Sequence, residues 1–216
     1  MKKFLNNNKK VCLFGIGIIL LVLIIVVVIL LSRDKDNSEV IYNPDAERFV
    51  NEYEVLNNTA VDNDDGKLYP NVDIPSDNVI DYSNSYEILE IFDDKETAVV
   101  YFGYSTCLYC RSAIEVLCDA ASETDLDKIY YLDAEKKDRN YTKIINVLGD
   151  SITVNEKGVK EIPLPLVLFI SRGDIVSYWK GTLSSQRDPY IKLDDSQKQG
   201  LKEIYINCIN DVISSK

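Results

Sequence analysis

The longest hydrophobic pattern in the sequence is an unbroken apolar run over residues 11–31, which contains no charged side chain. As an α-helix this run would be about 31 Å long, which matches the hydrocarbon core of a bilayer. It is longer than the apolar segment of a signal peptide, about 7–15 residues, and no small-residue cleavage site follows it. We therefore expect an uncleaved transmembrane anchor at 11–31, with a cleaved signal sequence as the alternative.

The charges on either side of this run predict its orientation. Residues 1–10 carry four lysines and no acidic residue, whereas Arg33 and Lys35 alternate with aspartates. The positive-inside rule then predicts a single-pass protein of the cell membrane. Residues 1–10 would lie in the cytoplasm, and everything after about residue 32 would be extracytoplasmic.

Weaker patterns beyond the anchor predict a stalk and a folded domain. Residues 32–82 are rich in Asp, Asn, Pro and Gly, which suits an acidic stalk, and Phe49 and Tyr53 indicate one short amphipathic helix within it. Apolar, β-branched or aromatic runs predict strands at 97–104, 128–133, 166–170 and 175–179. Periodic patterns predict helices at 83–94, 110–121, 141–148 and 196–213. This order predicts an α/β domain over 83–216, with a central mixed sheet and helices on both faces.

Composition excludes several classes of function. The chain has no histidine, which removes Ser-His-Asp and Cys-His catalysis and every metal site that depends on imidazole. Its net charge is -11, and the four lysines of residues 1–10 would not belong to the exported part. A surface this acidic repels phosphate backbones, so we expect no nucleic-acid partner.

The candidate chemistry lies in Cys107 and Cys110, which stand where a buried strand is predicted to pass into a helix. Ser105 or Thr106 could cap that helix. The helix N-terminus favours an anion, and the thiolate is the form of cysteine that attacks disulfides. Cys107 is therefore the candidate nucleophile and Cys110 the candidate resolving cysteine. A static disulfide and half of a zinc site are the alternatives, although the sequence has no second CxxC pair.

The motifs around this pair resemble those of the thioredoxin superfamily, over about residues 83–216. The stretch 164–174 (LPLVLFISRGD) is similar to the family's block of a cis-proline, a strand, a glycine turn and an acidic residue, and Gly181 corresponds to a second family glycine. The resemblance implies a thioredoxin-like fold in which Pro165, rather than Pro163, is the cis-proline that faces the active site. The Leu164 backbone would pair with the substrate chain.

A more local resemblance is to membrane-anchored thioredoxin-like proteins of Gram-positive bacteria, including bacteriocin transport accessory proteins. It is carried by 101–111 (YFGYSTCLYCR) and by the upstream stretch 49–57 (FVNEYEVLN). It implies a thiol–disulfide oxidoreductase without a bound cofactor, which acts on exported proteins or peptides and could be served by a membrane redox partner. A non-catalytic accessory subunit of an export system, with a structural disulfide, is the alternative.

Two departures from the thioredoxin pattern leave the direction of electron flow open. Tyr101 stands where thioredoxins have a buried aspartate, and a partner lysine on the next strand would fall near Lys128 or Ile129. The residues between the cysteines, Leu108 and Tyr109, differ from those of reducing and of strongly oxidising relatives. Because this dipeptide tunes the reduction potential, the sequence does not distinguish reductant from oxidant.

Three further residues have two interpretations each. Cys118 and Cys208 lie on the apolar stripes of two helices that would pack on one face of the sheet, so they either form a structural disulfide or remain two buried thiols. Arg111 either steadies a thiolate or pairs with Glu115 at helical spacing, and the pairing is favoured.

Overall fold

The computed structural model describes residues 43–62 and 66–214. The predicted anchor at 11–31 and the N-terminal segment 1–10 lie outside these residues. Among the helices that are described, none is both long enough and apolar enough to cross a membrane.

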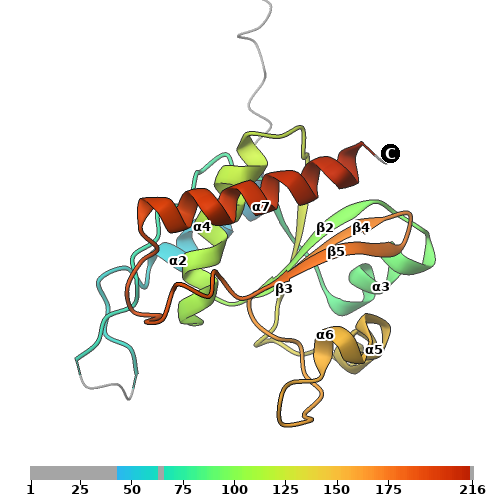
Figure 1. Ribbon diagram of the computed structural model, residues 1–216, viewed down its shortest axis with the longest axis horizontal. Coiled ribbons are helices and arrows are strands. Elements are labelled where there is room, and N and C mark those ends of the chain that lie inside the picture. Colours follow the sequence, from blue (N-terminus) through green and yellow to red (C-terminus); the bar gives the residue numbers. More distant parts are fainter. Residues whose placement is uncertain (1–42, 63–65, 215–216) are drawn as a thin grey trace, which may run out of the picture. The chain divides into compact units, whose positions relative to one another are not determined.

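A single mixed sheet of five strands organises the described part of the chain (Figure 1). The strands follow the spatial order β1-β3-β2-β4-β5. The first three are mutually parallel, and β4 runs antiparallel to both β2 and β5. Their bounds are β1 Ile80–Tyr82, β2 Ala98–Gly103, β3 Ile129–Asp133, β4 Leu166–Ser171 and β5 Asp174–Lys180.

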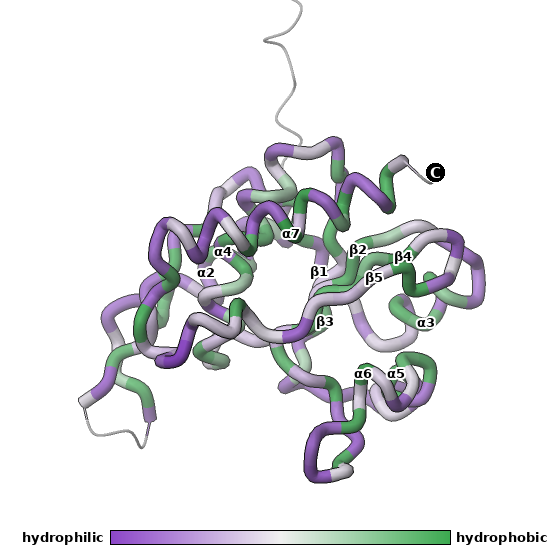
Figure 2. Tube along the Cα trace, viewed as in Figure 1, coloured by the Kyte–Doolittle hydropathy of each residue, from purple (hydrophilic) through white to green (hydrophobic). Residues whose placement is uncertain are grey.

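Helices cover both faces of this sheet. The first face, here called the α4 face, is covered by α2 (Pro44–Glu54), α4 (Leu108–Ser122) and α7 (Asp195–Ile213). The second, the α5 face, is covered by α3 (Ser85–Asp93), α5 (Tyr141–Leu148) and α6 (Asp150–Thr153). Strands β2 and β4 are buried along their whole length and are hydrophobic in Figure 2, whereas α7 alternates between hydrophobic and hydrophilic residues. These features confirm the predicted α/β class with a mixed sheet and helices on both faces.

The compact unit begins before the predicted domain boundary at residue 83. It starts at Asn43 and includes α2, whose buried Phe49 and Tyr53 pack in the core of the α4 face. Strand β1, which the sequence did not predict, pairs with β3 and forms one edge of the sheet. The helix and loops that the sequence assigned to the stalk therefore belong to the folded unit.

The turn between β4 and β5 is the predicted glycine turn. Arg172 and Gly173 have φ angles of 50° and 79°, and the Gly173 N–H donates to the carbonyl of Glu96 at 2.8 Å. A Cβ at position 173 would come within 2.8 Å of the Phe92 carbonyl oxygen. Glycine is therefore required here both by its positive φ and by the close approach of another backbone.

Candidate active site

The two motif cysteines lie at the carboxyl edge of the parallel strands, where β2 passes into α4. Cys107 and Cys110 form a disulfide with their Cα atoms 5.1 Å apart. Cys107 is itself the N-cap of α4, with extended φ and ψ angles of -76° and 113°, and its Sγ accepts the N–H of Cys110 at 3.2 Å. The expected cap from Ser105 or Thr106 is therefore wrong, because α4 begins at Leu108, two residues before the predicted start at 110, and the residue directly before it is Cys107.

The two sulfurs differ in their environments. Cys107 is half-buried, whereas Cys110 is fully buried behind it in the first turn of α4. Leu108 and Tyr109, between them, are half-buried at the same helix end. Because an N-cap position presents free N–H groups and the positive end of the helix dipole, this arrangement can stabilise a thiolate on Cys107.

The segment before β4 supplies the second feature of the site. The peptide bond between Leu164 and Pro165 is cis, and the cis bond precedes Pro165 rather than Pro163. Pro165 is buried, and its carbonyl accepts the N–H of Gly181 at 2.7 Å, just beyond β5. Leu164 is half-buried and faces a groove that it shares with Tyr104, the residue whose carbonyl accepts the Cys107 N–H at 3.2 Å.

This groove has a volume of about 520 Å³. Its walls come from the end of β2, the loop after β3, helix α5 and the segment that leads to Pro165. Aromatic and aliphatic side chains are mixed in it with two lysines and two glutamates. The residues that carry these properties are Tyr104, Tyr141, Ile145, Ile162, Lys137, Lys160, Glu135 and Glu161.

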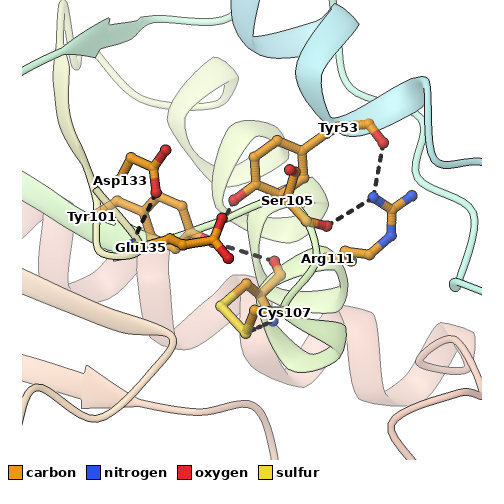
Figure 3. Close-up of a disulfide and its surroundings, with 8 residues drawn as sticks. Tyr53, Tyr101, Ser105, Cys107, Arg111, Asp133 and Glu135 are labelled. Atoms are coloured by element: carbon orange, nitrogen blue, oxygen red, sulfur yellow. Dashed lines mark hydrogen bonds between the residues drawn. A yellow bond between two sulfur atoms is a disulfide. The ribbon is translucent and has the colours of Figure 1, made fainter. Parts of the chain in front are cut away.

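Tyr101 is fully buried near the disulfide (Figure 3). Its hydroxyl donates to the Cys110 carbonyl at 3.3 Å and lies 3.4 Å from the hydroxyl of Tyr53. Burial raises the pKa of both phenols well above the ordinary value for tyrosine. A Cβ at Gly103 would collide with the Tyr101 hydroxyl, so the glycine that ends β2 leaves room for this ring.

The residue beside Tyr101 on the next strand is Tyr131, not Lys128 or Ile129. The two tyrosines are register partners in the β2–β3 pair, and their rings stack with centroids 5.6 Å apart. Lys128 instead forms an ion pair with Asp81 at 2.7 Å. The expected position of a partner residue was two places too early because the register of β3 against β2 is not visible in the sequence.

Arg111 is fully buried and binds four acceptors, none of which is Glu115. Its guanidinium donates to the carbonyls of Pro70 at 2.7 Å, Tyr53 at 2.8 Å and Ser105 at 3.1 Å. It also donates to the side-chain oxygen of Asn57 at 2.7 Å. Burial lowers the pKa of Arg111. The predicted pairing with Glu115 is wrong, since that carboxylate contacts Lys192 at 3.1 Å and also Lys198 on α7.

Cys118 and Cys208 are free thiols, so the structure contains no disulfide between them. Cys118 is buried in the core of the α4 face, and Cys208 packs at the edge of the same core. Burial raises the pKa of the Cys118 thiol far above its ordinary value. They therefore behave as small hydrophobic side chains rather than as a second redox pair.

The sequence analysis missed the contribution of α2 and the loop after it to the site. Tyr53 reaches Tyr101, while the Tyr53 carbonyl and Asn57 both bind Arg111. The signal was present, because residues 49–57 share the local resemblance with residues 101–111. Nothing in the spacing, however, indicates that the two stretches meet.

No family model matches the sequence, and no curated protein matches it either.

Proposed function

We propose that this protein is a membrane-anchored, extracytoplasmic thiol–disulfide oxidoreductase with a thioredoxin-like domain. The observation that carries the proposal is the half-buried Cys107 at the N-cap of α4, disulfide-bonded to the buried Cys110. The parallel–antiparallel sheet and the cis bond before Pro165 support the thioredoxin-like part. The apolar run at 11–31 and its flanking lysines support the anchor and its orientation.

In the reducing direction, the Cys107 thiolate attacks one sulfur of a substrate disulfide and forms a mixed disulfide. The other substrate sulfur leaves as a thiolate and takes up a proton. Cys110, once deprotonated, then attacks the Cys107 sulfur and releases the second substrate thiolate, so two electrons pass to the substrate and the protein disulfide is formed. The oxidising direction is the reverse. A dithiol or disulfide partner, for example one in the membrane, would restore the starting state.

The groove beside the pair suits an extended polypeptide. It lies between Tyr104 and Leu164, so a chain bound in it would pass next to Cys107, and the backbone of Leu164 would be available to pair with it. The lining mixes aromatic and aliphatic side chains with lysines and glutamates, which favours exported proteins or peptides that carry both hydrophobic and charged side chains near the reactive cysteine.

The test uses the purified full-length protein with a disulfide-bonded peptide and with its reduced form. We expect exchange to be catalysed in at least one direction. Cys107→Ser should reduce the rate to that of the uncatalysed reaction, because the attacking thiolate is lost, and Cys110→Ser should accumulate a mixed disulfide at Cys107.

Cys208→Ser is the matched control, because it removes a free thiol remote from the motif and should retain the wild-type exchange rate. The proposal fails if the wild-type protein catalyses exchange in neither direction. It also fails if Cys107→Ser is as active as wild type. Either outcome would favour the accessory subunit with a structural disulfide.

A further inference from the structure

Arg111 is a buried cation that has no carboxylate partner among the residues that the structure describes. Its side chain is fully buried, and its four acceptors are three backbone carbonyls and one amide oxygen. Within residues 43–62 and 66–214, no carboxylate forms an ion pair with it. The aromatic ring of Tyr69 lies 5.6 Å from its guanidinium carbon, and that ring too is neutral.

A buried charge of this kind is unusual, because buried ions in proteins are normally paired. The carbonyl oxygens replace the hydrogen bonds that water would make, but they do not cancel the net positive charge. Since the surrounding interior screens poorly, the field of Arg111 extends further than that of a surface arginine.

Arg111 lies in the first turn of α4, close to the loop that carries Cys107. Arg111 follows Cys107 by one helical turn, and its backbone N–H donates to the Cys107 carbonyl at 3.0 Å. Its guanidinium also donates to Ser105, two residues before the cysteine, so it lies beside the loop that carries Cys107 (Figure 3). A thiolate on Cys107 would thus meet the helix dipole, the Cys110 N–H and a fixed positive charge.

Other ionisable groups around the disulfide do not provide a comparable cation. Tyr53 and Tyr101 are neutral near pH 7, because burial raises their pKa. Asp133, the last residue of β3, pairs with Lys136 at 2.7 Å. The groove side carries charges of both signs: Glu135, Lys137, Lys160 and Glu161. These four side chains are exposed, so solvent screens them more than it screens Arg111.

We propose that Arg111 is a positioning residue whose guanidinium stabilises the thiolate of Cys107, and that it thereby favours the dithiol over the disulfide. The disulfide carries no charge, so this stabilisation acts on the reduced state alone. The inference rests on the proposed function in that it assigns Cys107 as the reactive sulfur. It also gives the site a direction, because a stabilised dithiol makes the pair a stronger oxidant.

The experiment compares two variants of the full-length protein. One removes the positive charge of residue 111, and the other neutralises it with a carboxylate beside it. Arg111→Met removes the cation and retains the aliphatic stem. Asn57→Asp retains the guanidinium and places a carboxylate against it, where the Asn57 oxygen now lies 2.7 Å away. The first readout is the pH dependence of iodoacetamide alkylation at Cys107 in the reduced protein, resolved from other thiols by peptide mass spectrometry. Both variants should raise the midpoint of this pH dependence by about one pH unit. Below the midpoint, this shift corresponds to roughly tenfold less Cys107 thiolate.

The second readout is the equilibrium of the protein with reduced and oxidised glutathione. Two glutathione thiols and the protein disulfide give the protein dithiol and glutathione disulfide, so the measurement needs no catalysed substrate. At pH 7 both variants should shift the equilibrium toward the protein disulfide by up to about tenfold, equivalent to about 30 mV. Well below the wild-type midpoint the shift should disappear, because Cys107 is then a neutral thiol in every variant.

Matched controls separate charge from packing. Arg111→Lys retains the cation, and Asn57→Ala loses hydrogen bonds without adding a carboxylate, so both should keep a midpoint close to wild type. The inference is overturned if these controls shift the midpoint as far as the charge-removing variants, or if those leave it unchanged. Asn57→Asp decides the question if Arg111→Met does not fold. A protein that fails to catalyse exchange but shows these shifts would contradict the proposed function and leave this inference standing.

Discussion

The two faces of the sheet bury different kinds of groups. The core of the α5 face is mostly aliphatic and includes Val100, Leu168 and Ile144, and its one buried phenol among the described residues is that of Tyr141. The core of the α4 face contains four buried phenols and two free thiols in addition to its aliphatic residues. These phenols belong to Tyr53, Tyr101, Tyr131 and Tyr205.

The face that buries the hydroxyls and thiols is also the face whose helix α4 carries the disulfide. A buried hydroxyl costs stability unless it has a hydrogen-bond partner, and an aliphatic core avoids that cost. On the α4 face the hydroxyls of Tyr53 and Tyr101 form a chain that ends on the Cys110 carbonyl. The Tyr205 hydroxyl has no hydrogen-bond partner within residues 43–62 and 66–214. We infer that the α5 face mainly supplies stability, whereas the α4 face also fixes the position of the cysteines.

Alkaline pH should have the largest effect on stability, and this effect should arise mainly on the α4 face. Burial raises the pKa of all four tyrosines of the α4 face, so in the folded protein they stay protonated where the unfolded chain ionises. Their contribution to stability is complete below about pH 10 and is lost as pH rises from there toward the raised folded values. Each group should lower the free energy of unfolding by about 1.4 kcal/mol per pH unit. Urea unfolding of the full-length protein from pH 8 to 11 measures this slope.

Tyr205→Phe provides the control for this slope. It removes a buried hydroxyl without a partner, so the variant should be at least as stable as wild type near pH 7 and lose less stability above pH 10. Cys118 adds a loss of the same slope that begins earlier, near pH 8.5, because burial raises its pKa as well. A flat stability profile up to pH 11 would contradict the assignment of the phenols to a dry core.

A cavity on the α5 face should have the next largest effect. Leu168 is fully buried in the middle of β4, so Leu168→Ala should lower the free energy of unfolding by about 2–5 kcal/mol. The rate of alkylation at reduced Cys107 should stay close to that of wild type in conditions where the variant is folded, because Leu168 packs on the opposite face from α4. Urea unfolding and alkylation kinetics on the same preparation test both statements. A large change in Cys107 reactivity would show that the faces do not act separately.

The sequence predicts the features of this structure that depend on local patterns, and it misses those that depend on long-range contacts. The strands of the sheet are dense in β-branched and aromatic residues, so the runs around Val100 and Leu168 were recognisable without long-range information. Strand β1 was missed because three residues, Ile80–Tyr82, are too few to show a pattern. Its place at the edge depends on pairing with β3, which is a long-range contact.

The cysteine pair and Pro165 were predictable because both belong to short local motifs. Arg111 was not, because helical spacing pointed to Glu115, four residues away. The partners that it has in the structure, Pro70 and Asn57, come from a loop 41 and 54 residues earlier in the chain. Local patterns identify the candidate reactive residues. The charges and hydroxyls that surround these residues come from segments that are distant in the sequence.

The smallest predicted effect concerns the hydroxyl chain itself. Both hydrogen bonds of Tyr101 are long, at 3.3 and 3.4 Å, so Tyr101→Phe should lower the free energy of unfolding by only about 1 kcal/mol. Tyr53→Phe should cost a similar amount, and the double variant should cost less than the sum, because the two hydroxyls share one bond. Tyr205→Phe is the matched control, since the Tyr205 hydroxyl is buried and has no hydrogen-bond partner among the described residues. Additive losses for Tyr53 and Tyr101 in urea unfolding would mean that the two hydroxyls contribute independently and that their shared bond adds no coupling. If neither substitution lowered the free energy of unfolding, the two phenols would stabilise the α4 face only through the packing of their rings.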